Sequence, residues 1–351
     1  MKKRVLGVAS LFLLIILFVA ENPLLAQGKK EYKVGIVAFY NLENLFDTIH
    51  QDGKKDYEYL PDGKNMWNTN KYKKKLTNMA KVISQIGADV SPDGPAVLGV
   101  CEAENIDVLN DLVKEDAIKD KNYKTILVEG PDRRGVDVGF IYNPKYFTVD
   151  SYKSHTFELE DKPDFFTRDQ LLVSGDFDGE RMHFIVLHWP SRYGGEKRSR
   201  PLRNAAAKVT RSIVDSVLRA EPNAKIFVMG DLNDDPTNES VIKHLNAKGN
   251  KKRLKEEELY NCVYNYFKKG IGTLAYRDNW NNFDQIIVTQ SLLNKDFSSY
   301  KLYKTGIFNK PFLKNKTGRY KGYPKRTFAG GAYQGGYSDH FPVYDVIIKE
   351  K

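Results

Sequence analysis

Residues 225–233 read Lys-Ile-Phe-Val-Met-Gly-Asp-Leu-Asn, an apolar run that ends abruptly in Gly230, Asp231 and Asn233. A short run of β-branched and aromatic residues that stops at a glycine predicts a β-strand buried on both faces. Such strands occur in α/β proteins, where other layers cover both faces of the sheet. Asp231 and Asn233 would then lie at the end of a rigid strand, a position that commonly carries chemistry.

Apolar strands that end in an acid, an amide or an imidazole recur along the chain. A single polar residue in this position is usually a turn residue or a helix cap. Several together favour one site built along a sheet edge. The further examples are Asn41 after the strand 34–39, Glu102 after 96–101, His188 closing 183–187, and Asp339 and His340 before 341–348.

The rest of the pattern interleaves strands and helices without an internal repeat or a shift in composition. It predicts one α/β domain over residues 27–351, since nothing marks a boundary between two. The further elements are strands at 123–128, 136–142 and 283–289, a hairpin of 170–175 and 181–188, and helices at 71–86, 106–114 and 204–218.

Composition bounds the class of protein. Of 351 residues, 41% are hydrophobic and 28% charged, which excludes a disordered tail and a polytopic membrane protein. Two cysteines exclude a disulfide-rich scaffold and a cysteine-built zinc site, and leave a Cys101–Cys262 bridge open. The formal net charge of +10 favours polyanionic partners.

Residues 1–26 have the pattern of a secretory signal peptide. Lys2, Lys3 and Arg4 precede the uncharged apolar stretch 5–20, and Ala26 offers a cleavage point. The stretch is shorter than the ~20 apolar residues of a spanning helix, so an uncleaved anchor is the lesser alternative. Cleavage leaves a formal charge of +8. We therefore expect a periplasmic or secreted monomer without stable membrane insertion.

The residues at the strand ends suit metal-assisted attack of water on a phosphate ester. Mg²⁺ prefers oxygen ligands and needs only one or two carboxylates, so Glu102 is the expected main ligand, with Asn41 and Asp339 completing the shell. Two histidines could serve as acid and base, each oriented by a carboxylate. Asp284 is the candidate partner of His340.

The chain resembles the endonuclease/exonuclease/phosphatase superfamily, which includes deoxyribonuclease I, in an ordered set of motifs. The resemblance implies a four-layer α/β sandwich, in which helices flank two packed mixed β-sheets, with a Mg²⁺ or Mn²⁺ site at the sheet ends. The motifs are Asn41-Leu42-Glu43-Asn44, Gly99-Val100-Cys101-Glu102, Arg134-Gly135-Val136-Asp137-Val138, Leu187-His188-Trp189-Pro190-Ser191-Arg192, Gly230-Asp231-Leu232-Asn233-Asp234, Phe283-Asp284-Gln285-Ile286 and Ser338-Asp339-His340-Phe341-Pro342-Val343.

The resemblance also implies roles for individual residues. Glu102 and Asn41 match the metal site, and Asp339 a second or water-bridged metal ligand. Asp231 matches the aspartate that orients or deprotonates water, and Asn233 its phosphate-binding neighbour. His340 pairs with Asp284, and His188 matches the histidine that protonates the leaving oxygen. Whether Asp231 or His340 is the base stays open, as does the partner of His188, for which Asp137 is a guess.

Basic and aromatic residues suggest how a substrate binds. Arg192 extends the His188 motif, Arg134 begins another, and Tyr142 loosely fits the family's active-site tyrosine. The acid-free segment 310–326 ends in Lys325 and Arg326, with tyrosines interleaved, which suits a nucleic-acid backbone.

The expected function is that of a secreted Mg²⁺-dependent phosphodiesterase, foremost a nuclease acting on DNA or RNA. The first alternative keeps the mechanism and changes the substrate to a phospholipid or a small phosphate ester. The second is a non-catalytic nucleic-acid-binding protein that keeps the fold.

Overall fold

The apolar run at residues 225–229 lies in the middle of a seven-stranded mixed sheet. The computed structural model describes residues 30–159 and 161–351, so the predicted signal peptide lies outside the described residues. This sheet has the strand order β5 (Phe147–His155), β6 (Gln170–Phe177), β7 (Glu180–His188), β8 (Lys225–Asp231), β13 (Asp284–Val288), β10 (Leu259–Asn261) and β9 (Ala247–Lys248).

A second mixed sheet packs against the first. Its strand order is β14 (Lys301–Ile307), β17 (Val343–Glu350), β1 (Tyr32–Leu45), β2 (Val97–Ala103), β4 (Asp137–Tyr142) and β3 (Lys124–Leu127). The central strands β1 and β2 run parallel, like β7 and β8 in the first sheet, while their other neighbours are antiparallel.

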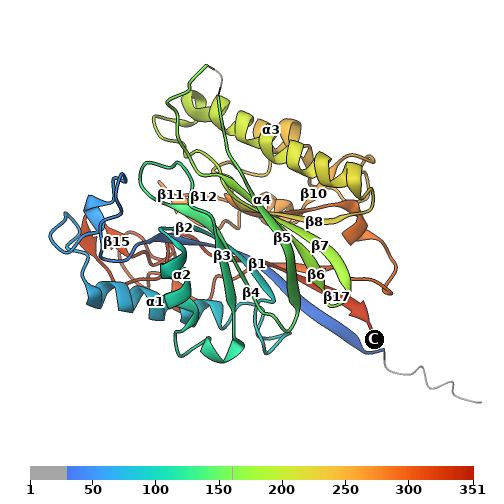
Figure 1. The fold of residues 1–351 in the computed structure, drawn as a ribbon, viewed down its shortest axis with the longest axis horizontal. Coiled ribbons are helices and arrows are strands. Elements are labelled where there is room, and N and C mark those ends of the chain that lie inside the picture. The colour runs from blue at the N-terminus through green and yellow to red at the C-terminus, as the bar shows by residue number, and fades with distance from the viewer. Residues whose placement is uncertain (1–29, 160) are drawn as a thin grey trace, which may run out of the picture. The chain divides into compact units, whose positions relative to one another are not determined.

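Helices cover the outer faces of both sheets. Helices α1 (Thr69–Ile83) and α2 (Ile106–Val113) lie against the six-stranded sheet, and α3 (Glu196–Ala220) lies against the seven-stranded sheet (Figure 1). The arrangement confirms the predicted four-layer sandwich. The short elements are the helix α4 (Tyr264–Lys268), the hairpins β11 (Leu274–Tyr276)–β12 (Asn279–Asn281) and β15 (Phe328–Ala329)–β16 (Ala332–Tyr333), and helical turns at Tyr57–Tyr59, Lys119–Lys121, Ser240–His244, Gln290–Leu293 and Pro311–Leu313.

The side chains of each central strand alternate between two cores. In β1, Ile36 and Ala38 face the layer of α1 and α2, whereas Val37 and Phe39 face the other sheet. Successive residues of a strand point to opposite faces, so a central strand of a four-layer fold has to be apolar on both. This explains why the strands that end in polar residues are continuous apolar runs.

Two features differ from the sequence prediction. Helix α3 begins at Glu196 rather than Asn204, because Arg203 is buried and its Nε lies 2.7 Å from Asp234 Oδ1, which anchors the early turns. Strands β5 and β14 were not predicted, because both are edge strands with little buried apolar surface: β5 is mostly exposed and β14 mostly half-buried. Cys101 and Cys262 are both free and buried, so the bridge left open does not form.

Residues Tyr32–Lys351 form one compact unit. None of the helices in the described part of the chain is both long and apolar enough to cross a bilayer.

Candidate active site

Strand register aligns three of the predicted catalytic residues across the seven-stranded sheet. His188 of β7 is paired with Asp231 of β8, and Asp231 is paired in turn with Asp284 of β13. Paired residues on neighbouring strands lie about 5 Å apart. Three residues separated by up to 96 positions in the sequence therefore form one row at the end of the sheet.

The other sheet contributes Asn41 and Glu102, each next to an irregularity in its strand. Register shifts follow Asn41 in β1 and occur at Glu102 in β2, and Glu43, Asn44 and Glu102 have φ of +49°, +53° and +60°. Non-glycine residues in this left-handed region are uncommon and often mark functional sites. The bulges turn Glu102 toward β1, where its Oε2 accepts the Asn44 N–H at 2.9 Å.

Asn41 joins the two sheets at the site. Its Nδ2 donates to Glu102 Oε1 at 3.3 Å and to Asp231 Oδ2 at 3.2 Å. Ser338 Oγ donates to the Asn41 carbonyl at 2.7 Å and accepts the His340 N–H at 3.1 Å. The segment before β17 is thereby fixed beside β1, which brings Asp339 and His340 to the same place.

His340 is oriented by Asp284, as predicted from the sequence. Its Nδ1 lies 2.7 Å from Asp284 Oδ2, while its Nε2 lies 3.8 Å from both Asp231 Oδ2 and Asp339 Oδ1. Although burial opposes the charge, the surrounding carboxylates, foremost Asp284 and Asp339, raise the pKa of His340 well above its usual value. The ring is therefore held as an imidazolium at neutral pH.

His188 differs from His340 in its charge state. Its Nε2 lies 3.7 Å from Asp231 Oδ2 and 3.9 Å from Glu102 Oε1, and its Nδ1 is buried with no hydrogen-bond partner within residues 30–159 and 161–351. Burial, together with the nearby Arg168, lowers its pKa well below the usual value. Asp137 is not its partner: Asp137 Oδ1 accepts the Gly130 N–H at 2.9 Å, and among the described residues no hydrogen bond or ion pair joins Asp137 to His188. The guess that Asp137 orients His188 was wrong.

Asp231 is the carboxylate that both imidazole Nε2 atoms face. Burial raises its pKa to about 7, although the charge of His340 opposes that rise. Its Oδ1 accepts the N–H of Asn233 at 2.9 Å, and Asn233 has a φ of +50°. The Asn233 Nδ2 donates to the Trp189 carbonyl at 3.0 Å, which ties the loop after β8 to the loop after β7.

The donor set fits a hard divalent cation. The carboxylates of Glu102 and Asp231 meet at the same Asn41 amide, and in the described part of the chain neither has a Lys or Arg ion-pair partner. Side-chain exposure is only 15% for Glu102 and 3% for Asp231, and the imidazolium of His340, 3.8 Å from Asp231 Oδ2, is one positive charge for two closely spaced carboxylates. A cation bound by oxygen would offset this charge.

One group of acidic and imidazole ligand atoms in the described residues is close enough to share a cation. Ligand atoms of Asp231, Asp284 and His340 lie within 4.8 Å of one another. Asp284 Oδ2 and His340 Nδ1 already share a 2.7 Å hydrogen bond, while Asp284 Oδ1 is buried without a hydrogen-bond partner among the described residues. The set around Glu102 matches the preference of Mg²⁺ for oxygen ligands better.

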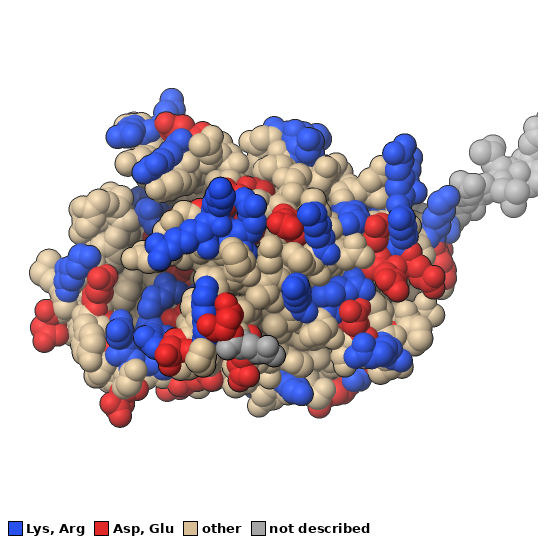
Figure 2. Space-filling model, turned by 90° about the horizontal axis from the view of Figure 1, so that it is seen from above, with Lys and Arg blue, Asp and Glu red and all other residues tan. Residues whose placement is uncertain are grey.

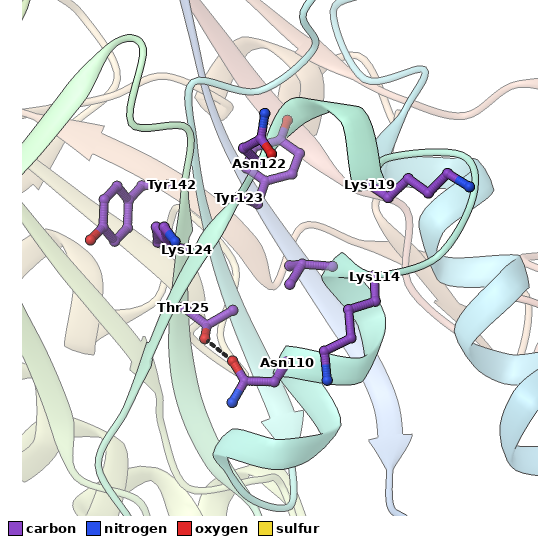
Figure 3. A pocket seen from close by; sticks show the side chains of 9 residues that line it. Asn110, Lys114, Lys119, Asn122, Tyr123, Lys124, Thr125 and Tyr142 are labelled. Atoms are coloured by element: carbon purple, nitrogen blue, oxygen red, sulfur yellow. Dashed lines mark hydrogen bonds between the residues drawn. The ribbon is translucent and has the colours of Figure 1, made fainter.

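Tyr142 lies away from these residues, contrary to the prediction. It is paired with Val97 at the start of β2, whereas Asp137, at the other end of β4, is paired with Ala103 beside Glu102. Five residues of strand separate the two ends by roughly 17 Å. Tyr142 instead lines a pocket with Lys124 and other residues of β3 and α2 (Figure 3).

Arg192 is near the site but its guanidinium is used within the protein. Its Nε donates to the Asn233 carbonyl at 2.9 Å, and its two amino groups donate to Glu196, Asp234 and Asn238. The prediction that Arg192 binds a phosphate directly therefore needs correction. The residue fixes the loop that carries Asn233.

The other basic residues predicted to bind substrate differ in position. Arg134 has a half-exposed side chain, and its pKa, which burial lowers, is raised overall by Asp132 and Glu102. Arg326 donates to Asp339 Oδ2 at 2.6 Å and to Glu43 Oε1 at 3.2 Å, so it lies at the site. Lys325 precedes it, half-buried, and its backbone N–H donates to the Leu313 carbonyl.

Glu43 and Lys75 belong to the site's support, and sequence reasoning missed both. Lys75 is buried in α1 and donates to Thr327 Oγ1 at 2.7 Å and to the Tyr337 carbonyl at 2.6 Å, with Glu43 Oε2 3.7 Å away. Burial, with the charge of Asp339, raises the pKa of Glu43 to about 7. A lysine between Tyr72 and Met79, on the apolar face of a predicted helix, was the available signal.

Known structures share this fold. A crystal structure of an endonuclease/exonuclease/phosphatase family protein from Bacteroides thetaiotaomicron aligns with a TM-score of 0.54 at 16% identity, covering 92% of this chain and 97% of that chain. A mannosyl-6-phosphatase from the same organism aligns with a TM-score of 0.52 at 17% identity, covering 89% of this chain and 99% of that chain. TDP2 from D. rerio, complexed with a single-strand DNA product, aligns with a TM-score of 0.53 at 13% identity, covering 90% of this chain and 98% of that chain.

No curated protein sequence matches the chain. The sequence model of the Endonuclease/Exonuclease/phosphatase family matches residues 36–349, a range that includes every candidate site residue described above. The chain therefore belongs to the Endonuclease/Exonuclease/phosphatase family, whose members are metal-dependent hydrolases of phosphate esters.

Proposed function

We propose that this protein is a Mg²⁺-dependent phosphodiesterase that cleaves nucleic acid. The observation that carries the proposal is the position of Asp231. Its Oδ2 lies 3.7 Å from His188 Nε2, 3.8 Å from His340 Nε2 and 3.2 Å from Asn41 Nδ2. A carboxylate that faces two imidazoles and stands beside a metal-type glutamate is suited to phosphoryl chemistry.

Glu102 would hold the cation, with Asp339. Asn41 would join them through its Oδ1 only if its amide turned, because its Nδ2 donates to Glu102 and Asp231 and its Oδ1 accepts the Glu43 N–H at 2.8 Å. When bound there, Mg²⁺ supplies a Lewis acid that polarises the phosphoryl oxygen and lowers the pKa of a water. Asp231 accepts the proton of the attacking water, since a pKa near 7 makes it a usable base at neutral pH. His340, held as an imidazolium by Asp284, stabilises the charge that develops on the phosphoryl oxygens.

His188 acts in its neutral form. A ring that carries no proton to spare is a poor general acid, so this proposal departs from the expectation that His188 protonates the leaving oxygen. The P–O bond to the leaving oxygen breaks as the water attacks, and that oxygen takes its proton from the imidazolium of His340 or from solvent. Its Nε2 is placed to hydrogen-bond the phosphate or the water between Asp231 and Glu102.

Charge supports a nucleic-acid substrate. The formal charge of +8 that remains after the predicted cleavage attracts polyanions, and Arg326 brings the basic segment 310–326 to Asp339. Figure 2 shows one face on which Lys and Arg stand in several separate groups with Asp and Glu between them. Net charge therefore steers a polyanion, and the segment at the site is the better candidate for direct contact. The similarity to TDP2, solved with a DNA product, accords with this proposal.

The test incubates purified protein with supercoiled plasmid, single-stranded RNA and bis-p-nitrophenyl phosphate, in Mg²⁺ or EDTA. We expect metal-dependent cleavage of nucleic acid that Asp231→Asn and His340→Ala abolish. Turnover of the small diester alone would move the substrate to phospholipids or small phosphate esters. If the wild-type protein turns over none of the three substrates, the result would favour a non-catalytic binding protein.

We also propose that the protein acts as a monomer in the periplasm or medium. The leader pattern of residues 1–26 supports export. Expression of the whole chain, followed by cell fractionation and N-terminal sequencing, should give a mature form that begins at Gln27. Light scattering should give the mass of one chain.

A further inference from the structure

A pocket of about 560 Å³ adjoins the candidate active site and has no part in the chemistry above. It lies between the hairpin β11–β12 (Figure 1) and the loop of residues 315–334. Its volume falls within the ~300–1,000 Å³ of ordinary ligand sites. Arg326 lines it, and the same guanidinium donates to Asp339 Oδ2 at 2.6 Å. A substrate held at Asp339 can therefore extend into this pocket.

Two exposed tyrosine–arginine pairs line the pocket. Tyr276 is 63% exposed and Tyr320 is 51% exposed. The guanidinium carbon of Arg277 lies 5.2 Å from the Tyr276 ring centre, and that of Arg319 lies 5.8 Å from the Tyr320 ring centre. Among the described residues, neither arginine has a carboxylate partner and neither tyrosine hydroxyl has a hydrogen bond. Exposed aromatic rings and unpaired guanidinium groups are typical of recognition surfaces.

The walls of this pocket are tied together. The Tyr323 hydroxyl accepts the Asp278 N–H at 2.7 Å and donates to Asp278 Oδ1 at 2.6 Å, which joins the loop to the hairpin tip. Arg277 and Asp278 have φ of +49° and +63°. Hairpin tips of this kind normally carry Asn-Gly, because a side chain is strained there. The bonds between Tyr323 and Asp278 hold the tip in this unfavourable conformation, in which Arg277 lies beside Tyr276.

We propose that this tyrosine–arginine pocket binds an unstacked nucleobase next to the scissile phosphate, with Arg277 and Arg319 on neighbouring phosphates. The inference rests on the proposed function and names its substrate as single-stranded nucleic acid. Aromatic faces stack on any base, and guanidinium forks match phosphate oxygens. A base inside a duplex reaches such a pocket only by leaving its stack. A small ester would place its single phosphate at Asp339 and leave both arginines unpaired.

The test compares three substrates of the full-length protein. They are a single-stranded oligonucleotide, DNA or RNA, that the wild type cleaves; a backbone of equal length with abasic residues throughout; and methyl p-nitrophenyl phosphate. Tyr276→Ala and Tyr320→Ala should each lower kcat/KM on the oligonucleotide roughly ten- to a hundredfold, as expected for a lost base stack. On the abasic backbone and on the small ester, kcat/KM of both variants should stay within about twofold of the wild-type value.

Matched variants separate stacking from general damage. Tyr320→Phe keeps the ring and should keep wild-type activity. Tyr303→Ala removes a tyrosine of β14 that is 67% exposed and lines a different pocket, and should have no effect. Arg277→Gln and Arg319→Gln should each reduce the slope of log kcat/KM against log salt by about 0.7, the value for one phosphate contact on a single strand.

Each contrary result has its own meaning. Tyrosine variants that cleave the oligonucleotide like the wild type would overturn the pocket assignment and leave the nuclease proposal intact. Equal losses on normal and abasic backbones would also overturn it, because the rings would then not be contacting bases. A wild-type protein that cleaves no nucleic acid but hydrolyses the small ester would overturn the proposed function and this inference together.

Discussion

Replacing Lys75 by methionine tests how the site is supported from the helical layer. Lys75 is buried in α1 and connects three parts of the fold: Glu43 in the bulge of β1, Thr327 in the loop before β15, and the Tyr337 carbonyl. Methionine fills a similar volume without the charge, so the change removes the ammonium and little packing. Burial lowers the pKa of Lys75, and the charge of Glu43 opposes this.

The size of the effect follows from what Glu43 keeps. Removing one partner of a buried ion pair costs ~3–5 kcal/mol, because the other charge stays buried. Glu43 still accepts the Thr327 N–H at 2.6 Å and the Arg326 Nε–H at 3.2 Å. We therefore expect the lower end of the range, a loss of about 3 kcal/mol in the free energy of unfolding.

The assay is urea denaturation of the wild type, Lys75→Met, Glu43→Gln and the double variant. The loss in the free energy of unfolding of the double variant should be smaller than the sum of the two single losses by ~0.5–3 kcal/mol, which is the usual coupling energy of residues in contact. Lys74→Met, which changes an exposed lysine one position away, should stay within about 0.5 kcal/mol of the wild type. A Lys75→Met protein as stable as the Lys74→Met protein would refute the reasoning.

Three further predictions concern single residues. Asp345 is buried in β17, its pKa is raised by burial to about 7, and its Oδ1 accepts a bond from Thr305. Since the folded state favours its protonated form, the free energy of unfolding should fall as pH rises from 4 to 7. At pH 8, Asp345→Asn should be more stable than the wild type by up to ~4 kcal/mol, and at pH 4 it should have no advantage. Thermal scans at the two pH values check this. Tyr142→Ala should leave phosphodiesterase kcat/KM within about threefold, since Tyr142 lies at the far end of β4; a hundredfold loss would return it to the site. Arg192→Gln should lower kcat more than it raises KM, because the change frees the loop of Asn233 and removes no contact with a phosphate. Steady-state kinetics that show an increase in KM alone would contradict this.

Much of the fold follows from the central strands. Runs such as 225–229 are apolar throughout, and only a sheet covered on both faces buries such strands. Edge strands are different, because β5 alternates weakly and is mostly exposed, so its residues carry little hydrophobic signal. The start of α3 depends on the Arg203–Asp234 ion pair, which joins residues from two segments and leaves no local pattern.

The sequence by itself determined the family, the four layers and the residues at the strand ends, because local apolar runs and short motifs specify them. The sequence also predicted the pairing of His340 with Asp284, but tertiary structure decided the other contacts among those residues. Strand register aligned His188, Asp231 and Asp284, and placed Tyr142 at the opposite end of its strand. Packing decided that the donors of Arg192 are already used and that Lys75 supports Glu43. These outcomes depend on contacts between segments far apart in the chain, and no local pattern encodes such contacts.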